Sequence, residues 1–402
     1  MFKIAQFPEK LKSFFKSVEK YFMWEHHEYF QTLVLLIAFS HGRKNISNLH
    51  RHLKSNTHRT RFNNFLLVGR FDEKALLRQK AIETVRDLDP QEGEEIMLVI
   101  DDSKKEKRGK NMDAVGKIFD PAKKAYCQGH LYVTATLYFR GYTIPFGIRL
   151  YVKKGDCRSL EVPFKKLTEL AVEMIEELEG LQGLKVKVLF DCFYLCKTVV
   201  RACKRMKFKF VSVLKSNRKL LRNGRRHSAG KYGKNLFRRK PKKKSKNGKY
   251  QYIRAGNFEA RGLGTISVIY SQRKKGNKAL TIVTDDLKCS AENILSFYEK
   301  RWSIEVFFKQ AKSNLGLGQY QNGTMRAAVI HLHLVCFAYI LLTHLHIKKQ
   351  SAKRKLIRTD CLSIESLQYD LRNLIWKDTV KLLKKKGPDS IVKELDQLLV
   401  MR

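Results

Sequence analysis

Acidic residues are scarce in this 402-residue sequence. Its 38 Asp and Glu are outnumbered by 81 Lys and Arg, which gives a formal charge of +43 and a pI near 10.0. A small acidic substrate does not require so much positive charge, whereas a long polyanion does, because each neutralised phosphate releases counterions. The composition therefore predicts a nucleic acid partner; a generally basic surface is the alternative. The chain is long enough to bury more than one domain.

Paired cysteines and a signal sequence are also missing. The eight cysteines form no CxxC pair, and the closest two, Cys192 and Cys196, lack a second Cys or His pair at zinc-finger distance. We therefore expect reduced thiols in a cytoplasmic protein. Charges interrupt the apolar start of the chain, so we expect no signal peptide there. Residues 327–346 are long enough to cross a membrane, but four histidines interrupt them, which favours a buried helix.

The residue pattern divides the chain into four parts. Helical patterns with basic connectors fill the first part, as in a helix-turn-helix DNA-binding domain or any small helical bundle. Strands and helices then alternate, which predicts an α/β fold with a mixed sheet and flanking helices. The expected parts are a helical domain (1–88), a core (89–214 and 289–347), a basic β-rich insertion (215–288) and a helical, basic C-terminal region (348–402).

Individual elements follow from apolar periodicity and turn residues. The expected helices are 29–39, 46–53, 71–88, 160–179, 195–206, 291–313 and 325–347, and short helices follow residue 350. The expected strands are 96–100, 131–139, 142–150, 186–190, 208–214, 250–255, 264–270 and 279–284. Residues 215–250 contain no acidic residue, and such a basic run is expected to stay open until it meets a polyanion.

Two aspartates directly follow expected strands of the core. Asp101 comes after strand 96–100, and Asp191 comes after strand 186–190. Ligands of an open α/β sheet gather beyond the carboxyl ends of its strands, so both side chains are candidates for chemistry. Either one could instead be an ordinary turn or helix cap. Asp102 competes with Asp101, which we prefer because it continues the strand, and Asp285 with Asp286 forms a second competing pair on the insertion.

Residues 291–313 place four functional side chains on one stripe of an expected helix. At about 100° per residue, the later three lie within about 60° of the first. These side chains are Tyr298, Arg301, Glu305 and Lys312. Glu305 can therefore reach the sheet edge that carries the aspartates, although an i,i+4 ion pair with Arg301 is the simpler alternative. Trp302 lies about 100° on from Arg301 and is expected to pack.

Three carboxylates that converge repel one another unless cations lie between them. Such a set suits two divalent metal ions about 3.5–4 Å apart, which activate the attacking oxygen and stabilise the leaving oxygen. Oxygen ligands without His or Cys favour Mg²⁺, with Mn²⁺ as a substitute. Asp101, Asp191 and Glu305 are therefore the candidate catalytic residues and metal ligands.

The spacing Tyr298-x2-Arg301-x3-Glu305-x6-Lys312 resembles the Y-R-E-K signature of DDE-type transposases of bacterial insertion sequences, the group called insertion-sequence family four. The separations of the three carboxylates and the long insertion are also similar to that group, over about residues 90–345. The resemblance implies an RNase H-like core and a helical N-terminal DNA-binding domain. It also implies cut-and-paste transposition in the bacterial cytoplasm, by a homodimer that holds two transposon ends and target DNA.

The resemblance assigns DNA contacts to the remaining residues of the motif. Tyr298, Arg301 and Lys312 would hold phosphates near the cut. The basic insertion would follow the DNA backbone through Arg238, Arg239, Lys240, Lys242, Lys243 and Lys244.

In relatives that form a DNA hairpin, an aromatic residue of the insertion holds a flipped base. Residues 215–288 contain no tryptophan, so Tyr250, Tyr252, Phe258 or Tyr270 would have to take that place. An RNase H-like nuclease or resolvase without strand transfer, and a non-catalytic DNA-binding protein, are the alternative functions.

Overall fold

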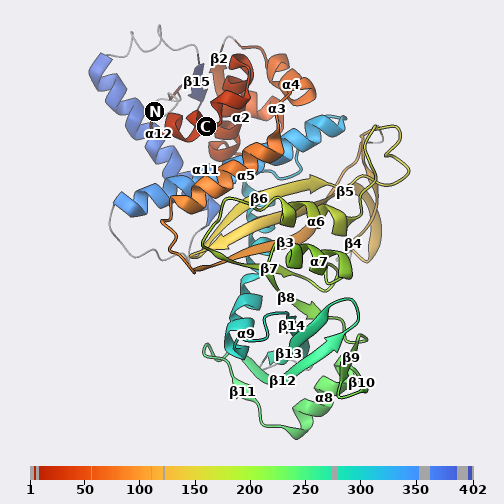
Figure 1. Ribbon diagram of the computed structural model, residues 1–402. Coiled ribbons are helices and arrows are strands. Elements are labelled where there is room, and N and C mark those ends of the chain that lie inside the picture. The colour runs from red at the N-terminus through yellow and green to blue at the C-terminus, as the bar shows by residue number, and fades with distance from the viewer. Residues whose placement is uncertain are drawn as a thin grey trace.

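The computed structural model describes residues 4–5, 9–55, 57–109, 111–120, 123–273, 279–352, 363–386 and 397–400. Figure 1 shows the N-terminal and C-terminal helices at one end of the molecule, a sheet in the middle and the β-rich insertion at the other end. The expected mixed α/β fold is therefore confirmed. The RNase H-like assignment and the domain boundaries stay predictions.

The central part of the sheet is built on both sides of β3 (Glu95–Glu106), whose first half is apolar and buried. The other strands of this part are β4 (Gly116–Asp120), β5 (Ala125–Phe139), β6 (Tyr142–Leu150), β7 (Lys185–Phe190) and β8 (Lys209–Leu214). Residues 96–100 of β3 are all at most 3% exposed, as expected for a strand that is covered on both faces. β5 and β6 turn at Arg140 and Gly141, both with positive φ, which is the expected hairpin. The sequence did not predict β4.

The insertion continues the central sheet. Its elements are β9 (Lys219–Arg222), β10 (Arg225–Ser228), α8 (Ala229–Arg239), β11 (Lys243–Lys244), β12 (Tyr250–Ala260), β13 (Gly264–Arg273) and β14 (Leu280–Thr284). β14 pairs antiparallel with β8, so a single sheet of twelve strands runs in the order β10-β9-β12-β13-β14-β8-β7-β3-β5-β4, with β11 beside β12 and β6 beside β5. Among the described strands of this sheet, β3–β7 and β7–β8 are the parallel pairs.

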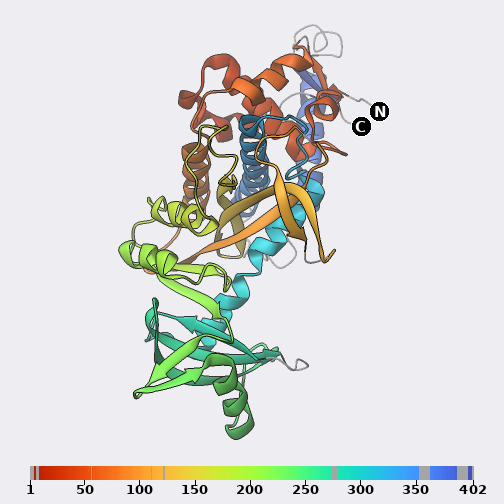
Figure 2. The same cartoon turned by 90° about the vertical axis from the view of Figure 1, so that its right-hand side faces the viewer.

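Helices cover both sides of the sheet. The helices of this part are α6 (Leu167–Glu176), α7 (Lys197–Arg205), α9 (Ala291–Lys300), α10 (Ser303–Asn314) and α11 (Met325–Ala352). Figure 2 shows α6 and α7 on one side and α9 and α10 on the other. In the described residues, α11 is the one helix that is apolar and long enough to cross a membrane, but 83% of its most apolar window is buried in the protein. The expectation of a buried core helix is confirmed.

The N-terminal part is not all-helical, contrary to expectation. It contains α1 (Glu9–Lys16), a 3₁₀ turn (Glu19–Tyr21), α2 (Trp24–Phe39), α3 (Ile46–His50), α4 (Arg59–Val68) and α5 (Glu73–Arg86). It also contains β1 (Ile4–Ala5) and β2 (Leu53–Ser55), which pair on either side of β15 (Gln397–Val400). Local patterns could not predict this small sheet, because its middle strand comes from the far end of the chain.

The C-terminal part has one long helix where short helices were expected. α12 (Ile364–Lys386) buries Ile364, Leu367, Leu371 and Ile375, which recur at helical spacing and face α2, α10 and α11. Packing against three other helices therefore stabilises α12 from Ile364 to Ile375, which is longer than a short helix. The seven cysteines in the described residues are free, as expected, and Cys361 lies outside those residues.

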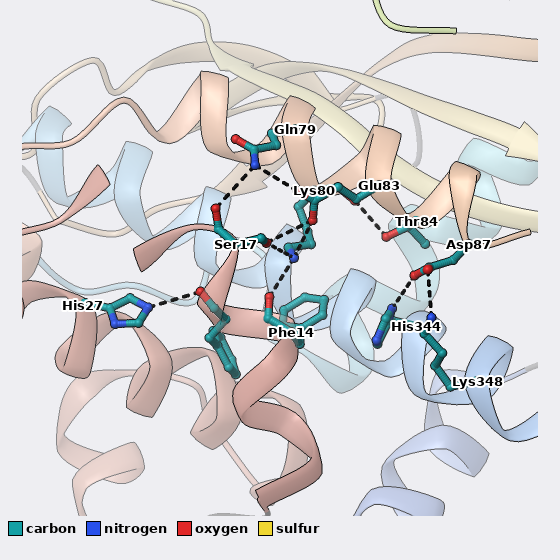
Figure 3. Close-up of polar contacts among 11 residues, drawn as sticks. Phe14, Ser17, His27, Gln79, Lys80, Glu83, Thr84, Asp87, His344 and Lys348 are labelled. Atoms are coloured by element: carbon teal, nitrogen blue, oxygen red, sulfur yellow. Dashed lines mark hydrogen bonds and ion pairs between the residues drawn. The ribbon is translucent and has the colours of Figure 1, made fainter. Parts of the chain in front are cut away.

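A buried polar network, which we call the N-terminal network, ties α1 to α5 (Figure 3). The Lys80 ammonium donates to the Phe14 carbonyl at 2.6 Å, the Ser17 hydroxyl at 2.7 Å and the Glu83 carboxylate at 2.7 Å. Burial alone would raise the pKa of Glu83, but Lys80 and the hydrogen bonds from Gln79 and Ser17 lower it below its usual value. Every charge in this part of the network has a partner.

The same network reaches α11 through Asp87. His344 and Lys348 contact this carboxylate at 2.9 and 2.8 Å (Figure 3). Burial alone would raise the pKa of Asp87, but these two partners lower it to about 2. The N-terminal helices are therefore attached to the core helix by satisfied charges.

Candidate active site

Asp101 and Asp191 lie at the same level on two neighbouring strands, at the point where the parallel pairing of these strands stops. β3 and β7 pair up to Ile100 opposite Phe190, and the next residue on each strand is an aspartate. β7 ends there as expected. β3 does not, because β5 continues to pair with it as far as Glu106. Asp101 therefore lies within a strand, at the point where the parallel pairing stops.

Asp191 has one oxygen engaged in a turn. Its Oδ1 accepts the backbone N–H groups of Phe193 at 2.8 Å and Tyr194 at 3.3 Å. Its backbone carbonyl accepts the Ser212 hydroxyl at 3.0 Å. The turn alternative is therefore correct for one oxygen, whereas the N-cap of the next helix, α7, is Cys196. The turn also orients the carboxylate.

The competing aspartates have other partners. Asp102 accepts the hydroxyl of the fully buried Tyr194 at 3.1 Å, and it points away from Asp101 because successive strand residues face opposite sides. Asp285 accepts the Phe210 N–H at 2.9 Å, and Asp286 pairs with Lys187. These last two contacts hold β14 to β8 and β7, so the pair has a structural role.

The helix that carries the Y-R-E-K residues is broken, contrary to the expectation of one helix over 291–313. α9 ends at Lys300 and α10 begins at Ser303. Between them the N–H of Arg301 bonds to the Tyr298 carbonyl and that of Trp302 to the Glu299 carbonyl, each at 3.1 Å, which is the tighter i→i−3 pattern. No Gly or Pro marks this break in the sequence. The angular argument for one continuous stripe therefore does not hold.

Arg301 nevertheless brings the helix and the sheet together. Its guanidinium contacts Asp101 Oδ2 at 3.2 Å and Glu305 Oε1 at 2.6 Å, and it lies 5.8 Å from the centre of the Tyr298 ring. The i,i+4 pair is thus present, but the same side chain also reaches a carboxylate 200 residues away in sequence. Burial acts to lower the pKa of Arg301, but Tyr298, Glu305 and Asp101 raise it overall.

Negative charge exceeds positive charge around this guanidinium. Burial raises the pKa of Asp101 to about 7; Arg301 opposes the shift, and Asp191 and Asp102 add to it. Burial also raises the pKa of Asp102. Carboxylates held in this way, with too little positive charge nearby, are typical of functional sites.

The donor chemistry of the site fits a divalent metal ion. Asp101, Asp191 and Glu305 offer only oxygen, which Mg²⁺ and Mn²⁺ prefer. A cation would also offset the burial and, to a smaller extent, the like charges of Asp191 and Asp102 that raise the pKa of Asp101. As they stand, however, no three Asp, Glu, His or Cys side chains of the described residues gather closely enough to hold one. Glu305 is engaged with Arg301 instead.

Lys312 attaches α10 to β3. Its ammonium donates to the Ser103 hydroxyl at 2.7 Å and to the Lys104 carbonyl at 3.0 Å. Burial lowers its pKa, and the neighbouring Lys105 and Lys104 lower it further. These contacts give Lys312 a positioning role two positions beyond Asp101 on β3. Its expected contact with phosphate stays a prediction.

Aromatic side chains are exposed on both segments that carry the carboxylates. Trp302, expected to pack, lies between α9 and α10 and is 59% exposed, and Phe193 in the Asp191 turn is 46% exposed. Nothing in the sequence pattern distinguished these two residues from core aromatics.

Most of the aromatic residues that were expected to hold a flipped base are buried. Tyr252, Phe258 and Tyr270 are at most 8% exposed and form the core of the insertion, so the structure contradicts that role for them. Tyr250 is half-buried.

The basic run is ordered, contrary to expectation. The Tyr232 ring of α8 packs against Phe258 and Tyr270, which fixes the helix on the insertion sheet. The six basic residues expected to follow the DNA backbone are all exposed, on α8 and the segment after it: Arg238, Arg239, Lys240, Lys242, Lys243 and Lys244.

Comparison with known proteins agrees with the resemblance. Residues 167–341 match the family described as "Transposase DDE domain". This range includes Asp191, Glu305 and the other Y-R-E-K residues, whereas Asp101 precedes it. The chain is also 33% identical over 81 residues to the "Probable transposase for insertion sequence element IS5377" of Geobacillus stearothermophilus. That match covers 20% of this chain and 22% of the relative, so the chain spans about a fifth of the relative's length.

Proposed function

We propose that this chain, whose residues 167–341 match the transposase DDE domain family, is a DNA transposase that cleaves insertion-sequence ends and joins them to target DNA. The observation that carries the proposal is the meeting of three segments. Asp101 and Asp191 leave paired strands at one level, and Arg301 connects Asp101 to Glu305 of α10.

The proposed reaction has two in-line displacements at phosphorus. Water first breaks the P–O bond at the transposon end, which leaves a 3′-hydroxyl on the element and a 5′-phosphate on the flank. That 3′-oxygen then attacks a target phosphate and displaces the target's 3′-oxygen. Asp101, Asp191 and Glu305 would hold the Mg²⁺ or Mn²⁺ ions, whose chemistry is to activate the attacking oxygen and stabilise the leaving one.

The other residues of the site would position DNA. Arg301 suits bidentate contact with a phosphate, and Tyr298 lies beside it. Lys312 would add a point charge where α10 meets β3. The exposed basic residues after α8 would contact the backbone without reading sequence. A homodimer that brings two ends together in the bacterial cytoplasm completes the proposal.

The first test is cleavage of labelled DNA that carries the element's own terminal repeats, with Mg²⁺ or with EDTA. We expect Mg²⁺-dependent nicks at the repeat boundary. In Glu305→Gln they should fall by at least about 100-fold, because even an outer-shell change at a metal site costs about 10–100-fold. Glu299→Gln is the matched control, since Glu299 lies nearby but contacts Asn247 of the insertion.

Three results would contradict the proposal. Full cleavage by Glu305→Gln would remove the assignment of the metal ligand. Binding without cleavage by the unmodified protein, with both Mg²⁺ and Mn²⁺, would indicate a non-catalytic DNA-binding protein. Nicks without joined products on paired ends would indicate a nuclease.

A further inference from the structure

Beyond the carboxylates, β4 and β5 form a two-stranded ribbon that extends past the rest of the sheet. β3 pairs with β5 only as far as Glu106 opposite Gly129. The Lys107 N–H just after β3 still donates to the Gln128 carbonyl at 2.9 Å, and residues 125–127 of β5 pair with β4 alone. We call residues 116–120 and 123–128 the β4–β5 arm.

One face of the arm is aromatic although it is exposed to solvent. Phe119 and Tyr126 are directly opposed across the two strands, and they are 49% and 63% exposed. Their ring centres lie 5.4 Å apart at 66°, and the Lys117 ammonium lies 4.8 Å from the centre of the Tyr126 ring. An exposed ribbon face normally carries polar side chains, so we expect a binding partner to cover these two contacting rings.

The charges around the rings favour a polyanion as that partner. Lys117, Lys123 and Lys124 are exposed on the arm. Lys123 pairs with Glu106 at 2.6 Å and Lys104 with Asp120 at 3.2 Å, so the nearby acids are already matched while positive charge remains. Aromatic rings beside cations are the usual surface for stacking on nucleic acid. A second copy of this chain suits this arm less well, because the arm's acids are already paired and another basic surface would add like charge to it.

The register places the arm relative to the site. Asp101 is opposite Thr134, and Tyr126 lies eight residues before Thr134 on the same strand. At about 3.4 Å per residue the separation is at most about 27 Å, or about eight base pairs of duplex. Because the interval is even and neither pairing shifts register, Tyr126 projects from the same side of the sheet as Asp101.

We propose that the β4–β5 arm is a DNA-contact arm, in which Phe119 and Tyr126 lie against bases and sugars and Lys117 contacts a phosphate. The position of that contact, within about eight base pairs of the cleaved bond, rests on the proposed function. The contact with DNA itself does not.

The first experiment measures binding of a fluorescein-labelled 30-base-pair duplex by anisotropy at fixed salt. We expect Phe119→Ala with Tyr126→Ala to weaken binding about tenfold, within the range for losing one base–aromatic contact. Tyr369→Ala is the matched control, because Tyr369 is also 63% exposed but lies on α12. We expect no change there. Equal binding by the arm variant and the control would overturn the proposal.

The second experiment places a photo-cross-linking phenylalanine analogue at position 119. One sample contains terminal-repeat DNA with its flank, and another contains target DNA. Cross-links within about eight base pairs of the cleaved or joined bond, in either sample, support the arm, and the sample that reacts identifies the DNA. Cross-links spread evenly along both duplexes would overturn the placement.

Two controls separate this proposal from other failures. The binding experiment is repeated in the Glu305→Gln background, where the tenfold effect of the arm should persist even without cleavage. Sedimentation of the arm variant tests the alternative occupant. Lost self-association with unchanged DNA binding would assign the rings to a second copy and overturn the proposal.

Discussion

The N-terminal network and the candidate active site are both built from buried carboxylates and cations, yet they differ in balance. In the network, Asp87 meets the Lys348 ammonium and the His344 ring, Glu83 meets Lys80, and the pKa of each carboxyl is lowered. In the site, a single guanidinium serves Asp101 and Glu305, and burial raises the pKa of Asp101 to about 7. Matched charges fix helices in place, whereas unmatched charges are suited to a ligand.

Three buried histidines, for which burial outweighs every charged neighbour, give the largest expected effect. Burial lowers the pKa of His130, His331 and His333 to about 4. In the unfolded chain these histidines take up a proton near pH 6.5. Their contribution to the free energy of unfolding is therefore fully present above that pH and is lost as the pH falls toward 4. By pH 5 we expect each histidine to remove about 2 kcal/mol from the free energy of unfolding.

Urea unfolding between pH 7 and pH 5 measures this loss. His331→Gln removes one of the three titrating groups, so the free energy of unfolding should fall by about 2 kcal/mol less between pH 7 and pH 5. This holds whether or not the substitution changes stability at pH 7. An unchanged slope in this variant would contradict the prediction.

The next effect tests the matched side of the comparison. Lys80→Met leaves Glu83 and the Phe14 carbonyl without their buried donor, so we expect the free energy of unfolding to fall by about 3 kcal/mol. Lys348→Met is the control. Its ammonium is also paired, but the side chain is 56% exposed, and we expect a loss below about 1 kcal/mol. Equal losses would mean that burial does not set the strength of the network.

The smallest effect tests the unmatched side and has the opposite sign. Asp101→Asn removes a charge that burial, and to a smaller extent Asp191 and Asp102, disfavour, so at pH 8 in EDTA we expect the free energy of unfolding to rise by about 1 kcal/mol. Asp87→Asn should lower it by about 2 kcal/mol, since that carboxylate is paired. Urea unfolding measures both. A loss of stability in Asp101→Asn would break the comparison between the two clusters.

Several features of the protein could be predicted from sequence because they depend on neighbouring residues. Strand 142–150, the hairpin at Arg140 and Gly141, and the burial of α11 follow from apolar pattern and turn chemistry. The spacing of the Y-R-E-K residues led to the family that the comparison with known proteins supports. A parallel pair brings together the residues that follow its two strands, so Asp101 and Asp191 could be chosen without the structure.

Other features depend on contacts between distant parts of the chain, and only the tertiary structure decided them. β5 extends β3 past Asp101, and β15 completes a sheet with β1 and β2. Trp302 is exposed at the break between α9 and α10, and the Arg301 guanidinium reaches both a strand and a helix. Periodicity gives the direction of a side chain relative to its own helix or strand. Which other segment lies in that direction depends on how the whole chain packs.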